Sequence, residues 1–127
     1  MRELPALSEN QLEIMDSVWH RKEATLGDVW SDLSATRPVA KNTIQTLLTR
    51  LVDKGWLTTR LEGKTYHYSA TRPRDTTLSN VVKKLVDTAF KGSTEGLMMA
   101  LLDGRELTKD EVKRIRELIE KVEKESK

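Results

Sequence analysis

Apolar residues recur at helical spacing between Ala40 and Gly55, and this stretch has the most informative pattern in the chain. Their spacing of i, i+3, i+4, i+7 and i+8 predicts a helix with one buried stripe, formed by Ile44, Leu47, Leu48, Leu51 and Val52. The opposite face holds only short amide and hydroxyl side chains, namely Asn42, Gln45, Thr46 and Thr49. The helix therefore has an apolar side for a core and a second side of unusual polarity.

The polar side of this helix predicts contact with DNA bases. Glu and Lys are better helix formers, whereas short amides and hydroxyls compete for backbone hydrogen bonds. In the major groove Asn or Gln can pair with adenine, and Thr can contact the thymine methyl group. We therefore predict a recognition helix whose base contacts come from Asn42, Gln45, Thr46 and Thr49. An ordinary amphipathic helix with a polar outer face is the alternative.

Two shorter helices are expected before the recognition helix. Ser8 starts the first as part of a capping box, and the apolar periodicity continues to about Arg21. A short extended link at residues 24–26 precedes a second helix over Asp28–Ala35. Pro38 follows it and cannot continue a helix. The order of these elements is that of a helix-turn-helix.

After Gly55 the pattern changes from helical to extended. Residues 56–61 and 64–69 are rich in β-branched and aromatic side chains, and Glu62-Gly63 is a turn signal between them. Three helices followed by a β-hairpin predict a winged helix-turn-helix DNA-binding domain over residues 1–71. The fold class expected is mainly α with a small β-hairpin.

Residues 72–127 are expected to form a helical dimerisation arm. Three further helices follow a linker at Pro73, and each has an apolar stripe that so short a segment cannot cover alone. We predict that a second copy covers them in a homodimer. The alternative is that the arm folds back on the first domain of its own chain. The interface residues expected are Leu78, Val82, Leu85, Val86, Leu97, Leu101, Ile115 and Ile119.

Positive charge is concentrated around the predicted recognition helix and hairpin. The 127-residue chain has a formal net charge of +2. Six basic and two acidic residues lie between Arg37 and Lys64, so this window has a charge of +4. Such a concentration is typical of phosphate contact, with a solvated surface patch as the alternative. The phosphate contacts predicted are Lys41, Thr43, Arg50, Arg60 and Lys64.

Composition argues against several other classes of function. The absence of cysteine excludes disulfides and thiolate metal sites, and the two histidines fall on different predicted elements. The sequence has no nucleophile–base arrangement and no phosphate-binding glycine loop. We therefore expect no enzyme activity, catalytic residue, metal or cofactor. The remaining rival is a winged helix that serves as a protein-interaction module without sequence-specific DNA binding.

A cytoplasmic location without membrane insertion is also expected. No apolar run approaches the roughly 20 residues that span a bilayer. The N-terminal segment MRELPALSEN is too polar for a signal peptide.

Taken together, these motifs resemble the penicillinase-repressor (BlaI/MecI/CopY) family of bacterial transcription regulators. The resemblance covers about Leu7 to Ile119 and rests on LSENQLEIMDSVW, NTIQTLLTRLVDKGWL, RLEGKTYHYSA and LLDGRELTKDEVKRIRELIEK. It implies a homodimeric repressor of a palindromic double-stranded DNA operator. In the best-known members, a membrane-bound β-lactam sensor protease triggers cleavage of the arm and so frees the promoter.

Two departures from the family pattern concern the inducing signal. The copper-responsive branch has a cysteine-rich C-terminus, which this chain lacks. The protease-controlled branch is cleaved between Asn and Phe, and the matching bond here joins Ala100 to Leu101. The resemblance thus implies Ala100–Leu101 as the site of regulatory cleavage, with the Asn replaced.

Overall fold

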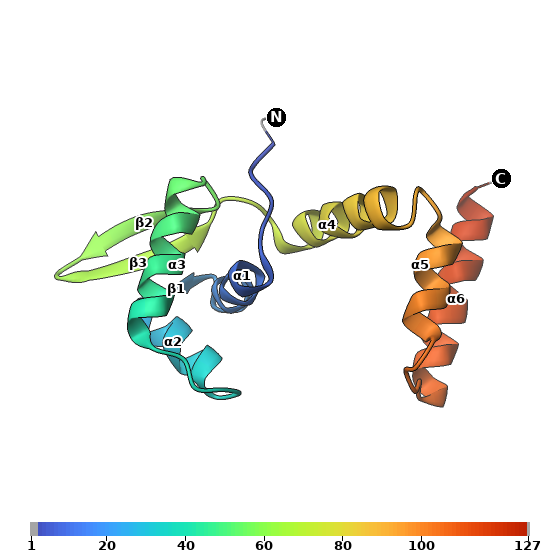
Figure 1. Ribbon diagram of the computed structural model, residues 1–127, viewed down its shortest axis with the longest axis horizontal. Coiled ribbons are helices and arrows are strands. Elements are labelled where there is room, and N and C mark those ends of the chain that lie inside the picture. The colour runs from blue at the N-terminus through green and yellow to red at the C-terminus, as the bar shows by residue number, and fades with distance from the viewer. Residues whose placement is uncertain (1–2, 127) are drawn as a thin grey trace. The chain divides into compact units, whose positions relative to one another are not determined.

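The computed structural model describes residues 3–126, which form six helices and one small three-stranded sheet (Figure 1). The elements are α1 (Glu9–Arg21), β1 (Glu23–Ala24), α2 (Leu26–Ser34), α3 (Lys41–Asp53), β2 (Leu57–Glu62), β3 (Thr65–Ala70), α4 (Arg74–Ala89), α5 (Thr94–Leu102) and α6 (Lys109–Glu125). This mainly helical fold with a winged helix-turn-helix confirms the fold class expected from the sequence.

Reciprocal hydrogen bonds set the starts of α1 and α2. The Gln11 backbone N–H donates to the Ser8 hydroxyl at 3.2 Å, and the Ser8 N–H donates to the Gln11 side chain at 2.9 Å. Thr25 and Asp28 form the same arrangement at 3.0 and 3.1 Å. Because Thr25 is an N-cap, α2 begins at Leu26, two residues before its predicted start.

The sheet has one strand more than the predicted hairpin. Its order is β1-β3-β2, and all of its pairs are antiparallel. Glu23 pairs with Ser69 and Ala24 with Tyr68, so part of the segment before α2 is a strand rather than a link. Gly63 has φ +62°, which the tight turn between β2 and β3 requires and which glycine adopts without strain.

One apolar core joins the first three helices to the sheet. Every fully buried large side chain in residues 3–126 belongs to it, and all come from α1, α2, α3 or β2. These residues are Ile14, Met15, Val18, Val29, Ile44, Leu48, Leu51 and Leu57. The core therefore fixes α3 against the rest of its unit and leaves the opposite face of that helix in solvent.

Each of the three tryptophans ties an irregular segment to this core. The indole N–H of Trp56 donates to the Pro5 carbonyl at 2.8 Å, and that of Trp30 donates to the Val39 carbonyl at 2.8 Å. The indole N–H of Trp19 donates to the Arg72 carbonyl at 2.9 Å. Large apolar rings thus anchor the N-terminal segment, the turn before α3 and the segment after β3.

A polar cluster also joins α1 to α2. The Arg21 guanidinium contacts the Asp32 carboxylate at 2.7 and 2.8 Å, and the Ser17 hydroxyl donates to the same carboxylate at 2.7 Å. Hydrogen bonding to Arg21, and to a smaller extent to Ser17, lowers the pKa of Asp32 from 3.8 to about 2.

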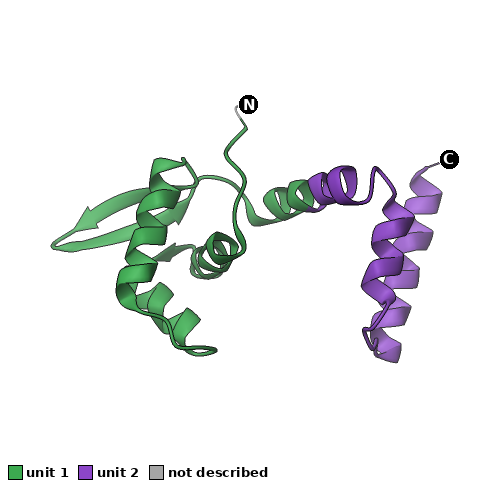
Figure 2. Ribbon diagram, viewed as in Figure 1, with its two compact units in different colours: residues 1–81 green, residues 82–127 purple. Residues whose placement is uncertain are grey.

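Contacts divide the chain into two compact units, residues 1–81 and 82–127 (Figure 2). The boundary falls inside α4, which starts directly after Pro73 at Arg74. A functional boundary between residues 71 and 72 stays a prediction.

The second unit exposes much of its apolar surface. The structure buries no described residue of α5 or α6 within the single chain. Exposed fractions reach 63% for Met99, 62% for Leu118 and 61% for Val122. Ser93 caps α5, so this helix begins at Thr94. No helix within residues 3–126 is both long and apolar enough to cross a membrane.

Candidate nucleic-acid interface

The outer face of α3 is fully available to a partner. Asn42, Gln45, Thr46 and Thr49 are all exposed, whereas Ile44 on the opposite face is completely buried. The division of α3 into a core face and a polar face is therefore the one that its periodicity predicts. The four predicted base-contact residues share one surface of one helix.

Two threonines on this face use their hydroxyl protons within the helix. Thr46 Oγ1 donates to the Asn42 carbonyl at 3.0 Å, and Thr49 Oγ1 donates to the Gln45 carbonyl at 2.9 Å. Ser and Thr commonly bond to the carbonyl one turn earlier in this way. A partner therefore meets their methyl groups and oxygen lone pairs, and a methyl group is what thymine recognition requires.

Gln45 makes the one side-chain hydrogen bond between α3 and the hairpin strands that is resolved within residues 3–126. Its Nε2 donates to Tyr68 Oη and to Thr49 Oγ1, both at 3.3 Å. Tyr68 lies on β3 and is only 4% exposed. The sequence does not predict Tyr68 as a site residue, because Tyr66 is two positions away on the same strand and is 53% exposed.

Lys41 stands at the start of α3 beside a tryptophan. Its ammonium nitrogen lies 5.0 Å from the centre of the Trp30 ring, within the range of a cation–π interaction. Trp30 comes from α2 and is fixed by its bond to Val39. The interaction holds a positive charge at the first turn of α3, where phosphate contact is predicted. The sequence offered no signal for this pairing.

Thr43 and Arg50 are exposed on α3, and Lys64 is exposed at the turn of the hairpin. No salt bridge to Arg50 or Lys64 occurs within residues 3–126, so both charges are available to phosphate. The assignment of these three residues to phosphate contacts stays a prediction.

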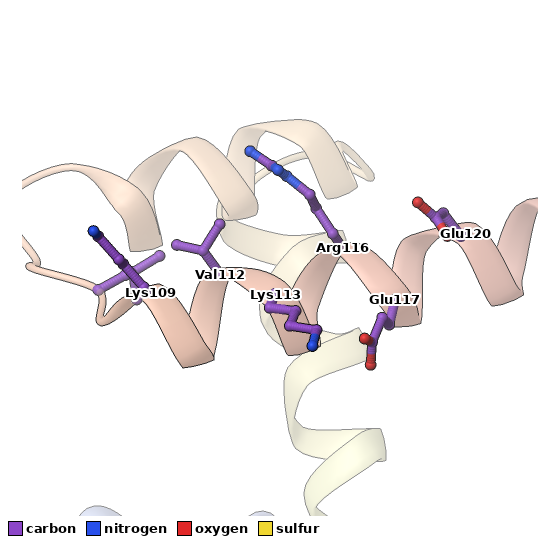
Figure 3. Close-up of a pocket in the computed structure, with 7 residues that line it drawn as sticks. Lys109, Val112, Lys113, Arg116, Glu117 and Glu120 are labelled. Carbon is purple, nitrogen blue, oxygen red and sulfur yellow. The ribbon is translucent and has the colours of Figure 1, made fainter.

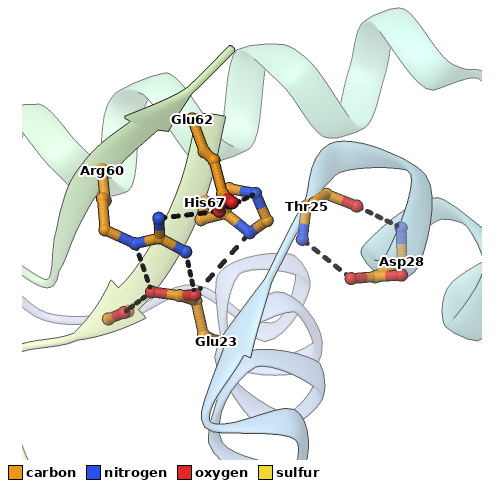
Figure 4. A network of polar contacts seen from close by, with 7 residues as sticks. Glu23, Thr25, Asp28, Arg60, Glu62 and His67 are labelled. Atoms are coloured by element: carbon orange, nitrogen blue, oxygen red, sulfur yellow. Dashed lines mark hydrogen bonds and ion pairs between the residues drawn. The ribbon is translucent and has the colours of Figure 1, made fainter. Parts of the chain in front are cut away.

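Arg60 differs because it lies in a network of carboxylates (Figure 4). Its guanidinium contacts Glu23 at 2.6 Å and Glu62 at 2.8 Å. The imidazole of His67 lies 3.7 Å from each of the same carboxylates. Hydrogen bonds from Arg60 lower the pKa of Glu23 and of Glu62, and those carboxylates raise the pKa of Arg60.

This network reduces the positive charge that the sequence window indicated. Arg60 is paired with Glu23 and Arg37 with Glu13, and both acidic partners lie before residue 37. A count confined to residues 37–64 misses them. Within residues 3–126, the positive charges of this window that form no ion pair are those of Lys41, Arg50, Lys54 and Lys64.

A shallow groove on the second unit has a different character (Figure 3). It follows one side of α6 and is lined by basic, acidic and apolar side chains, namely Leu107, Lys109, Val112, Lys113, Arg116, Glu117 and Glu120. Over residues 3–126 there is no cluster of three His, Asp or Glu side chains that could hold a metal ion. His20 on α1 and His67 on β3 lie on different elements.

The penicillinase repressor sequence profile matches residues 7–121 of this chain. The chain belongs to the penicillinase repressor family. It is 24% identical over 115 residues to the methicillin resistance regulatory protein MecI of Mammaliicoccus sciuri. The alignment covers 91% of this chain and 94% of MecI. The chain is 24% identical over 120 residues to the penicillinase repressor of Bacillus licheniformis, with 94% of each covered.

A solved structure of one family member matches the first unit. This is the solution structure of monomeric Bacillus licheniformis BlaI in complex with the blaP half-operator. It is 32% identical to this chain, covers 59% of this chain and 92% of its own, and has a TM-score of 0.51. The family resemblance stated from the motifs is thereby confirmed, and family members of this kind are repressors rather than enzymes.

Proposed function

We propose that this protein is a transcriptional repressor that binds a palindromic DNA operator as a homodimer and is released by an inducing signal. The observation that carries the proposal is the exposed amide and hydroxyl face of α3. It lies in a unit that is 32% identical to a BlaI structure with a bound half-operator. The protein would act in the cytoplasm, where its binding partner is operator DNA.

Base reading is assigned to the outer face of α3, and positioning on the phosphates to the residues around it. Asn42, Gln45, Thr46 and Thr49 can offer amide, hydroxyl and methyl groups to base edges. The phosphate contacts are assigned to Lys41, Thr43, Arg50 and Lys64. Arg60 would join them if its guanidinium left the Glu23 carboxylate and bound a phosphate instead. Charge thus gives affinity, while the uncharged face gives sequence preference.

Dimerisation is assigned to the arm over residues 72–127. Val82, Leu85 and Ile119 are 46%, 45% and 49% exposed in the single chain, so they are surface that a second copy can cover. Leu78, Leu97 and Ile115 are half-buried, whereas Val86 is 8% exposed and contributes mainly to packing within its own chain. A dimer would bury the exposed side chains and present two copies of α3.

Release is assigned to cleavage of the Ala100–Leu101 bond in the arm. Both residues are exposed near the end of the nine-residue helix α5. A short helix without buried residues can open locally, as a protease requires. Linking two binding units adds a factor of about 10² to 10⁴ in affinity, which cleavage would remove without touching a DNA contact. A membrane-bound sensor protease system is the proposed partner.

The experiment that tests the repressor function compares duplex DNA of defined and random sequence. Full-length protein would first select its site from a library of duplexes, and binding would then be measured across salt concentrations. The proposal requires tighter binding to the selected palindrome than to random DNA, and a steep salt dependence on both. Failure to retain any duplex at low salt would instead favour the protein-interaction module.

A second experiment separates cleavage from release of an intact protein. The chain would be blotted for size while its promoter is repressed and after induction. Cleavage predicts a fragment that ends near Ala100 when transcription begins. Full-length protein throughout derepression would rule out cleavage and leave a ligand bound to the arm as the explanation.

A further inference from the structure

The side-chain nitrogen of Gln45 lies within hydrogen-bond distance of two acceptors on the protein. Nε2 lies 3.3 Å from Tyr68 Oη on β3 and 3.3 Å from Thr49 Oγ1 one turn further along α3. Gln45 itself is exposed, so its amide is at the surface while one of its two partners is held in the core. The side chain is therefore anchored rather than free to turn in solvent.

Thr49 determines which end of the amide faces the protein. Its only hydroxyl proton is donated to the Gln45 backbone carbonyl at 2.9 Å. Thr49 Oγ1 can then only accept a hydrogen bond from the Gln45 side chain, and only an amide NH₂ can donate one. The oxygen and nitrogen of an amide are interchangeable in shape, but here the local bonding chemistry separates them.

Tyr68 completes this orientation from the hairpin. The ring is 4% exposed and packs in the same core as Ile44 and Leu48, so its hydroxyl has a fixed position beneath Gln45. With one N–H on Thr49 and the other on Tyr68, the NH₂ group has no proton left for a base. The carbonyl oxygen Oε1 is then the group of Gln45 that remains for DNA.

We infer that Tyr68 is a specificity-determining residue, which holds Gln45 so that it reads a base through an acceptor alone. This inference rests on the repressor function proposed above. In the major groove adenine N6 and cytosine N4 are donors, whereas guanine O6 and N7 and thymine O4 are acceptors. The base facing Gln45 is therefore adenine or cytosine, because guanine or thymine would place acceptor against acceptor.

The inference separates two ways in which Gln45 could contact adenine. A bidentate contact would need one N–H to donate to adenine N7, at the expense of the bond to Tyr68 or Thr49. A single contact from adenine N6 or cytosine N4 to Oε1 leaves both bonds in place. The hairpin thus takes part in base selection through Tyr68 without reaching the DNA itself.

The test uses full-length protein and a duplex library in which every position of the half-site is varied. The Gln45→Ala variant identifies the position that Gln45 reads, where preference should fall by about 5- to 100-fold. Wild-type protein should prefer one base pair at that position, and the adenine or cytosine of that pair should supply the donor to Oε1. Tyr68→Phe, which retains the buried ring, should reduce the preference there by about three- to tenfold and leave the other positions unchanged.

Two further variants separate orientation from stability. Ser17→Ala also removes a hydrogen bond from a buried hydroxyl, but it lies on α1 and should alter no base preference. Gln45→Glu replaces the amide by an acceptor-only group at an exposed position, so it should fold normally and keep the base-pair preference of the wild type at that position. It thereby tests the acceptor assignment even if Tyr68→Phe unfolds.

Each result decides for or against the inference. Loss of the wild-type base-pair preference in Gln45→Glu would overturn the acceptor assignment. An unchanged profile in folded Tyr68→Phe, or an equal loss at all positions, would remove the role of Tyr68. These outcomes leave the repressor function standing. Wild-type protein without any sequence preference would instead contradict the repressor function, and this inference with it.

Discussion

The guanidinium of Arg60 on β2 lies 2.6 Å from the carboxylate of Glu23 on β1, although 37 residues separate them in the sequence. The contact connects the two-residue strand before α2 to the hairpin. It also sets the electrostatics of the hairpin, because a cation that could bind phosphate is already neutralised. Lys64, at the turn of the same hairpin, has no such partner within residues 3–126.

Arg60 and Lys64 should therefore contribute unequally to DNA affinity. Lys64→Ala should weaken binding to all sequences about equally and reduce the salt slope by roughly one. Arg60→Ala should change the slope by less, because it also releases two carboxylates near the DNA. Titrations of random duplex at several salt concentrations measure both slopes. Equal changes would show that Arg60 leaves its carboxylates when DNA binds.

Glu23→Gln offers the matching change on the acidic side. Removing this charge should free Arg60 and tighten binding to random DNA, with a steeper salt slope. The depressed pKa of Glu23 predicts that its contribution to stability is present above about pH 4.5 and declines as the pH falls below it. Weaker binding by Glu23→Gln would indicate that the network orients the hairpin rather than masking its charge.

Asp32→Asn should make the protein less stable at neutral pH and less sensitive to acid. Asp32 has a pKa of about 2 when folded, against 3.8 as its ordinary value, so its stabilisation is full above about pH 4 and fades towards pH 2. The side chains of Arg21 and Asp32 are 36% and 34% exposed, so screening limits the expected loss to about 1 kcal/mol.

Urea unfolding from pH 2 to pH 7 measures this effect. The curves of wild type and Asp32→Asn should converge at the acid end of the range. Asp16→Asn is the control, since Asp16 is exposed on α1, the helix that carries Arg21, and forms no ion pair within residues 3–126. A constant difference between wild type and Asp32→Asn at all pH values would contradict the assignment to the Arg21 pair.

Leu48→Ala should be the most damaging of the single changes considered. Leu48 is completely buried at the centre of the α3 stripe, and truncating a buried leucine typically costs 2–5 kcal/mol. Leu61→Ala is the matched control, because Leu61 is 58% exposed on β2. Denaturant unfolding should show a small change for the control. Similar losses in the two variants would mean that the hairpin packs more tightly than its exposure indicates.

Leu101→Asp should convert the proposed dimer into a monomer. A buried, unpaired carboxylate in an apolar interface is costly, and Leu101 is 46% exposed in the single chain, so the monomer itself should remain folded. Light scattering should report the change in mass, and affinity for a palindrome should fall about 10²- to 10⁴-fold. Lys124→Asp introduces the same side chain on the polar side of α6 and should leave the dimer intact.

The parts of the fold that the sequence predicted are those with a long periodic signal or a clear turn. The stripe of α3 repeats several times, so its burial follows directly from spacing. The hairpin was predicted from its residue types and its turn, and alternation does not describe its burial, because Tyr66 is 53% exposed and Tyr68 is 4% exposed. Strand β1 has only two residues and therefore no period, and it exists because Glu23 and Ala24 find partners on β3. The start of α2 lies two residues before the predicted one because the capping box of Thr25 and Asp28, rather than apolar periodicity, sets it.

The site shows the same limit. The exposed face of α3 follows from helical geometry, so its members could be named from the sequence. The bond between Gln45 and Tyr68, the pairing of Arg60 with Glu23 and the position of Lys41 over Trp30 all join separate elements. Such pairs depend on how the elements pack, which spacing within one element does not encode.

The three tryptophans also make the protein its own spectroscopic probe. Each indole N–H donates a hydrogen bond to a different backbone carbonyl, that of Pro5, Val39 or Arg72. The fluorescence of each tryptophan should therefore depend on whether the segment that it anchors is in place. Replacing two of them by phenylalanine would leave a single fluorophore that reports on the N-terminal segment, the turn before α3 or the start of the arm. DNA should perturb the emission of Trp30 most directly, because Lys41 lies over its ring.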